Sequence, residues 1–224
     1  MSKKDRPQTE SAFTLFTKSA RIVSENLPLF IIVSIATIAQ AVHSIVQKQV
    51  TVVEINSVND FFKLLGITPA IFAAFVVISI VMTAVLPKLT TELAKGKKPT
   101  VGNLWEFAMK YTFPVFALSV VSGFAIMGGF ILLIIPGIIL LRKFFLAPYV
   151  LVDQETGIIE SLKISARMTD KAPGSIWGLI GVSLLIALPS VISVYGIGAI
   201  ATAALTVAYS AAPALRYQEL KKLK

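Results

Sequence analysis

The 224-residue sequence contains no cysteine and only one histidine, His43. Without cysteine the chain can form no disulfide, no thiolate nucleophile and no cysteine-ligated metal site. A lone histidine has no second imidazole with which to hold zinc or a di-iron pair. We therefore expect neither a metal nor any other cofactor.

Charged residues are also scarce, at 15% of the chain, whereas a typical soluble domain carries about 25%. Hydrophobic residues make up 55%, and the mean hydropathy is +0.79. A soluble core of this size could not bury so much apolar surface, but a lipid bilayer can. The composition predicts an all-α, polytopic integral membrane protein.

The apolar runs contain no aspartate or glutamate. Proton-coupled pumps generally need carboxylates in mid-membrane, and aspartyl intramembrane hydrolysis needs a pair of them. Hydrolysis by a serine–histidine pair is disfavoured because His43 lies near the end of its run. The acids Asp153, Glu155 and Glu160 cluster at one expected membrane edge and are interpreted as solvated loop acids. We predict no catalytic residue and no enzyme, with an unrecognised active site as a minor alternative.

About six transmembrane helices are expected, arranged as three hairpins within residues 27–217. Residues 111–141 carry no charge, and Pro136 and Gly137 divide this stretch at a predicted structural hinge. A five-span alternative fuses the two halves and places the C-terminal lysines outside. The six expected runs cover 27–47, 67–86, 112–134, 138–152, 173–194 and 197 to about 209.

The net charge is +9, and the distribution of lysine and arginine along the chain predicts its orientation in the membrane. They concentrate in the N-terminal segment 1–26, the 88–110 loop and the basic tail 218–224, whereas the 48–66 loop holds two lysines. Cation-rich loops stay in the cytoplasm. We expect both termini to be cytoplasmic and the protein to lie in the cell (plasma) membrane. A signal peptide is the alternative for the first run, but its leading segment is too long.

Three amphipathic segments, 13–23, 101–110 and 158–169, are predicted to lie at the membrane interface as leader helices. Each precedes a proline that opens or interrupts an apolar run, namely Pro28, Pro114 or Pro173. This order suggests a repeated unit of leader helix and hairpin. The alternative is that chance similarity between apolar segments gives the same pattern.

Arg142 and Lys143 lie inside the fourth apolar run, where charge is costly and often marks a site. Both lie close to the expected turn, so their side chains can extend to the interface as anchors. The other interpretation is that they contact an anionic lipid headgroup or substrate. They are the candidate site residues of the sequence.

Residues 132–140 read LLIIPGIIL, 146–153 read LAPYVLVD, and 160–169 read ESLKISARMT, with Trp177 following. This order resembles the membrane domain associated with bacterial glycerophosphodiester phosphodiesterases, and similar stand-alone bacterial membrane proteins. The resemblance covers about residues 125–180 in detail. In that family the phosphodiesterase chemistry belongs to a separate soluble domain, so the resemblance implies a membrane module and no enzyme.

The sequence therefore favours a non-enzymatic scaffold or accessory module that interacts with membrane lipids, chiefly anionic headgroups, or with a partner protein. The alternative is a small transporter or permease component for an anionic or lipid-like substrate. Stripes of small residues in the apolar runs allow close helix packing and would also support a homo-oligomer. Clustered cations with interleaved aromatics are absent, so no nucleic acid is expected as a partner.

Overall fold

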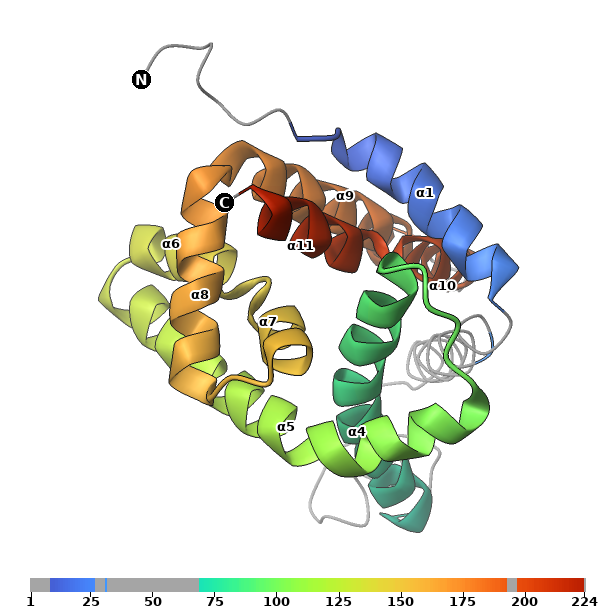
Figure 1. Ribbon diagram of the computed structural model, residues 1–224. Helices are drawn as coiled ribbons and strands as arrows, with labels where there is room; N and C mark the ends of the chain where they lie inside the picture. Colours follow the sequence, from blue (N-terminus) through green and yellow to red (C-terminus); the bar gives the residue numbers. More distant parts are fainter. Residues whose placement is uncertain (1–8, 27–30, 32–68, 193–196, 224) are drawn as a thin grey trace.

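The computed structural model describes residues 9–26, 31, 69–192 and 197–223, and in these ranges it contains helices and no strand (Figure 1). The predicted first span, the 48–66 loop and His43 lie outside the described residues, as does part of the predicted turn at 195–198. The helices are α1 (Ala12–Glu25), α4 (Pro69–Ala94), α5 (Val101–Leu132), α6 (Ile134–Phe144), α7 (Ala147–Gln154), α8 (Ile158–Lys171), α9 (Pro173–Ile192), α10 (Ile197–Tyr209) and α11 (Ala212–Lys222).

Three described segments are long and apolar enough to cross a membrane: Val76–Ala94, Gly102–Leu132 and Ile134–Gln154. A fourth is obtained if α8 and the first part of α9, which meet at a bend of 102°, are counted as one broken span. The predicted all-helical class with membrane-length apolar helices is confirmed. The number six and the arrangement as three hairpins stay predictions.

Helix α5 joins two segments that the sequence analysis separated. Its 32 residues run without interruption from the expected interfacial segment 101–110 through Pro114 and into the expected third span. At about 1.5 Å per residue such a helix is about 48 Å long, which exceeds the ~30 Å hydrocarbon core of a bilayer. Pro114 does not end it, because membrane helices tolerate proline where neighbouring groups satisfy the freed carbonyl. Its polar first turns thus continue directly into its apolar remainder.

Between α4 and α5 the chain reverses over a short polar loop. Helix α4 continues through Pro87 to Ala94, past the predicted end of its run at 86. Gly96, at φ +81°, terminates it in the left-handed conformation that glycine adopts without steric cost. Thr100 then caps α5, since its backbone N–H donates to the Asn103 side chain at 2.9 Å. These two caps fix the lysine-rich loop against both helices.

The chain turns between α5 and α6 at Leu133, three residues before the predicted break. Leu133 has extended backbone (φ −162°, ψ 145°) and separates the two helices by itself. Pro136 and Gly137 lie inside the first turn of α6. Proline is tolerated in a first turn because its missing N–H would have no partner there in any case. A second interruption separates α6 from α7 within the predicted fourth run, with Pro148 in the first turn of α7.

Glycines let α5 and α6 approach closely after this turn. A Cβ atom on Gly137 would lie 2.5 Å from Cγ of the Phe130 ring, and one on Gly129 would lie 3.0 Å from the Gly137 backbone. The neighbouring Gly128 faces open space, with no atom within 4 Å of such a position. Small residues at contacts of this kind allow membrane helices to pack backbone against backbone.

The polar and apolar parts of the described molecule are separated in space. Helix α8 packs across α5, α6 and α7, and α1 lies along the edge formed by α9, α10 and α11 (Figure 1). The side chains of residues 131–135, at the α5–α6 turn, are 68–78% exposed although all are leucine or isoleucine. An exposed apolar surface of this size is more stable in contact with lipid than in contact with water.

We expect Gly137→Ala to destabilise the protein by about 1–3 kcal/mol, because the added methyl group must displace the Phe130 ring. The matched control is Gly128→Ala, which adds the same methyl group to the same hairpin in open space. Thermal unfolding of both variants in detergent micelles measures the difference. Equal midpoints for the two variants would show that the close approach does not hold the hairpin together.

Candidate functional site: a layer of shared ion pairs

The charged residues at the polar ends of α4, α5, α7 and α11 form a connected set, here called the ion-pair layer. It consists of the carboxylates Glu92, Asp153 and Glu155 together with the lysines and tyrosines that contact them. Each carboxylate is approached by at least two donors, and those of Asp153 come from parts of the chain that lie far apart in sequence.

Glu92, in the last turn of α4, is shared by three lysines. Lys88 lies one helical turn before it, at 3.3 Å, and Lys95 lies after it, at 3.2 Å. The turn at Gly96 brings Lys97 back to the other carboxylate oxygen at 2.9 Å. The Glu92 side chain is only 9% exposed, so this carboxylate exchanges most of its water for ammonium groups.

Asp153, near the end of α7, is fully buried and joins three helices. Its carboxylate contacts Lys95, which directly follows α4, and Lys221 of α11 at 2.6 Å. The Tyr217 hydroxyl, also on α11, donates to it at 2.7 Å. Burial and the hydrogen bond to this carboxylate raise the pKa of Tyr217, so the phenol stays a donor. A buried carboxylate is stable only with such a set of partners.

Glu155 follows α7 in the left-handed conformation, at φ 52°. A non-glycine residue there stores about 1 kcal/mol of strain or more. The geometry places the carboxylate over α5, where Lys110 donates at 2.6 Å and the Tyr111 hydroxyl at 2.7 Å. The hydrogen bond from Lys110, then that from Tyr111, hold the pKa of Glu155 below its ordinary value.

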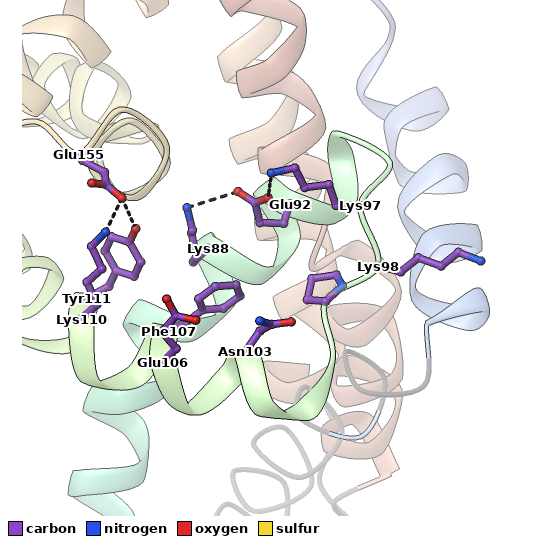
Figure 2. Close-up of a pocket in the computed structure, with 11 residues that line it drawn as sticks. Lys88, Glu92, Lys97, Lys98, Asn103, Glu106, Phe107, Lys110, Tyr111 and Glu155 are labelled. Atoms are coloured by element: carbon purple, nitrogen blue, oxygen red, sulfur yellow. Dashed lines mark hydrogen bonds and ion pairs between the residues drawn. The ribbon is translucent and has the colours of Figure 1, made fainter.

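A cavity of about 390 Å³ opens between the end of α4 and the start of α5, beside the layer. Figure 2 shows Lys88 and Lys97 directed toward Glu92, and Lys110 and Tyr111 directed toward Glu155, while the Lys98 side chain points away. The charged part of the lining consists of four lysines and three glutamates: Lys88, Lys97, Lys98, Lys110, Glu92, Glu106 and Glu155.

Lys88 is the most constrained cation of this cavity. Its ammonium group donates to the Val152 carbonyl at 3.0 Å and pairs with Glu92. It also lies 5.1 Å from the centre of the Tyr111 ring and 5.8 Å from that of Phe107, within the range of cation–π attraction. The side chain is 13% exposed. Lys88 therefore supports the cavity and has little freedom to meet a ligand.

The candidate residues of the sequence, Arg142 and Lys143, lie elsewhere. Both pair with Asp170, near the end of α8, at 2.5 and 3.0 Å respectively. The Ser165 hydroxyl donates to the Lys143 carbonyl at 2.6 Å, which fastens α8 to α6 at the same place. The two cations are thus partnered by protein and do not join the cavity, and their contact with a lipid or substrate stays a prediction.

Sequence reasoning did not identify the ion-pair layer. The interpretation of the cluster as solvated loop acids is wrong for Asp153, whose side chain is fully buried, while Glu160 is exposed as expected. The partners of Asp153 lie more than fifty residues away along the chain, so local pattern gives no sign of them. One available signal is the spacing of Tyr217 and Lys221, which places a phenol and an ammonium group on one face of a helix.

We expect Asp153→Asn to lower the free energy of unfolding by about 2 kcal/mol, because it leaves Lys95 and Lys221 without their shared anion. Both lysines are partly exposed, at 28% and 43%, so the loss is smaller than for a fully buried pair. Glu25→Gln is the control, since it removes a solvent-exposed pair with Arg21 that contributes little to stability. Chemical denaturation in micelles measures both. A loss as small as the control's would contradict the central place of Asp153.

No protein-family model, no curated protein and no solved structure matches the chain. The resemblance to the membrane domain of the glycerophosphodiester phosphodiesterases therefore stays a prediction, and function has to be argued from the geometry of the chain itself.

Proposed function

We propose that the chain is a multi-pass module of the cell membrane, without catalytic activity of its own, that binds anionic lipid headgroups and serves as a scaffold or accessory to a partner protein. Both termini are proposed to be cytoplasmic. The observation that carries the proposal is the division of the molecule into an apolar end and a charged layer in which the carboxylates are already taken by lysines.

Helix α8 offers cations that its own chain does not neutralise. Lys163, Arg167 and Lys171 are exposed and follow one another at intervals of four residues, so they form one row on the helix. The opposite face is buried against the bundle and includes Leu162, Ser165 and Met168. Of the two acids on α8, Asp170 already binds Arg142 and Lys143.

A basic row of this kind is attracted to anionic lipid. Cations held near a membrane surface contribute about 1 kcal/mol each to such binding. Within the described residues, neither Lys163 nor Arg167 forms an ion pair. The row therefore supports binding to acidic headgroups on the side of the molecule that carries α8.

The transporter alternative requires Arg142 and Lys143 to meet an anionic substrate. In the structure both are held by Asp170, and the Arg142 side chain is only 13% exposed. A substrate would have to displace a protein carboxylate before it could bind. This arrangement favours a role for the pair in fastening α6 to α8 and supports the scaffold proposal over transport.

We expect the double variant Lys163→Gln/Arg167→Gln to bind phosphatidylglycerol about 30-fold more weakly, as the loss of two surface cations at about 1 kcal/mol each implies. The control is Lys18→Gln/Arg21→Gln on α1, another 14-residue helix, where Glu10 and Glu25 already pair with the two cations. Native mass spectrometry of the full chain with added lipid gives the occupancy of each. Undiminished phosphatidylglycerol binding by the α8 variant would refute the proposed lipid contact.

A further inference from the structure

The cavity between α4 and α5 is lined by charges of both signs. A purely anionic ligand there would face the carboxylates of Glu106 and Glu155, and a purely cationic one would face the lysines. Like charges brought together in a partly desolvated site repel strongly. A ligand that carries one charge of each sign finds a partner for both.

The charges that remain available lie on the rim of the cavity. Glu106 is exposed, and within the described residues no side chain forms an ion pair with it. Lys97 and Lys110 are 67% and 52% exposed, so each can turn toward a ligand while its glutamate keeps another donor. Lys110 lies one helical turn after Glu106, and Lys97 comes from the loop before α5 (Figure 2).

We propose that this cavity binds a zwitterionic phosphate ester bearing a primary ammonium group, the chemistry of a phosphoethanolamine headgroup. The phosphate meets Lys97 and Lys110, and the ammonium group donates hydrogen bonds to the Glu106 carboxylate. Charge-assisted hydrogen bonds of this kind are the strong ones in proteins. This inference rests on the proposed function in one respect: the ion-pair layer must lie at the level of the lipid headgroups.

The aromatic side chains of the cavity favour a primary over a quaternary ammonium group. Recognition of choline relies on open aromatic faces. Here Phe107 and Tyr111 already face the ammonium group of Lys88, which is held by Glu92 and the Val152 carbonyl. A primary ammonium group needs a hydrogen-bond acceptor instead, and Glu106 supplies one.

An apolar stripe on α5 leads away from this rim and suits acyl chains. Met109, Phe113 and Phe116 are 71%, 79% and 42% exposed and lie in line at helical spacing. Trp105, 73% exposed, stands at the polar end of the stripe, as interfacial tryptophans do. A lipid with its headgroup in the cavity can therefore lay its chains along α5.

The test compares phosphatidylethanolamine, phosphatidylcholine and phosphatidylglycerol with identical acyl chains, bound to the full-length protein and counted by native mass spectrometry. Wild type is expected to retain phosphatidylethanolamine over phosphatidylcholine. Glu106→Gln is expected to weaken phosphatidylethanolamine binding about tenfold, since one hydrogen bond to a charged group is lost. Glu160→Gln, at an exposed glutamate of α8, is the matched control and should change nothing.

Charge reversal provides a second readout that does not depend on loss of binding. Glu106→Lys should shift the preference of the protein from phosphatidylethanolamine to phosphatidylglycerol. Equal retention of phosphatidylethanolamine and phosphatidylcholine by wild type, or no difference between Glu106→Gln and Glu160→Gln, would overturn the proposal.

Soluble competitors distinguish the two sources of this chemistry. If free phosphoethanolamine displaces the bound lipid while inorganic phosphate does not, the headgroup alone is recognised. If neither displaces it, the acyl chains on the α5 stripe are needed and the ligand is the lipid. Displacement by inorganic phosphate to the same extent as by phosphoethanolamine would contradict the role of Glu106. The proposed binding of phosphatidylglycerol by α8 is tested with different residues, Lys163 and Arg167, and with a different lipid. Failure of that proposal can therefore be distinguished from failure of the phosphoethanolamine site.

Discussion

The buried carboxylate of Asp153 is the constraint on which the polar half of the structure depends. Removing an ionised carboxylate from water costs several kcal/mol, which only close cations and hydrogen-bond donors can offset. Those donors come from the residue after α4 and from α11, so the ends of three helices must meet at one point. The apolar halves cannot impose this register, because lipid tails are as apolar as the side chains they touch.

A second set of polar contacts fastens the N-terminal helix to the same region. Arg216 of α11 is fully buried and donates to Glu219 at 2.5 Å and to the Glu10 carbonyl at 2.6 Å. Ser19 of α1 donates to the Ala208 carbonyl at 2.7 Å and accepts from the Ala211 N–H at 3.0 Å. Burial lowers the pKa of the Arg216 guanidinium, although the nearby carboxylates oppose this effect. Directional bonds thus set the position of α1, which apolar contact alone would leave free to slide.

The sequence predicted the helical class because long uncharged runs have few other structures open to them. It did not place the turn at Leu133, since the proline that marks a break is itself tolerated inside the first turn of the next helix. Periodicity in 158–169 indicated that Leu162, Ser165 and Met168 share a face. It could not say that this face is covered by the bundle and not by lipid. The burial of Asp153 was beyond local pattern because its partners are distant in sequence.

The ion-pair layer tolerates the loss of a lysine better than the loss of a carboxylate. Each carboxylate has at least two donors, so the loss of one lysine leaves every anion with a partner. Loss of a carboxylate instead leaves two or three donors facing one another, and where these are ammonium groups they repel. The same surplus of donors lets Lys97 or Lys110 turn to an incoming phosphate while Glu92 and Glu155 keep their remaining contacts. The headgroup binding proposed for this layer would therefore leave in place the contacts that hold its helices together.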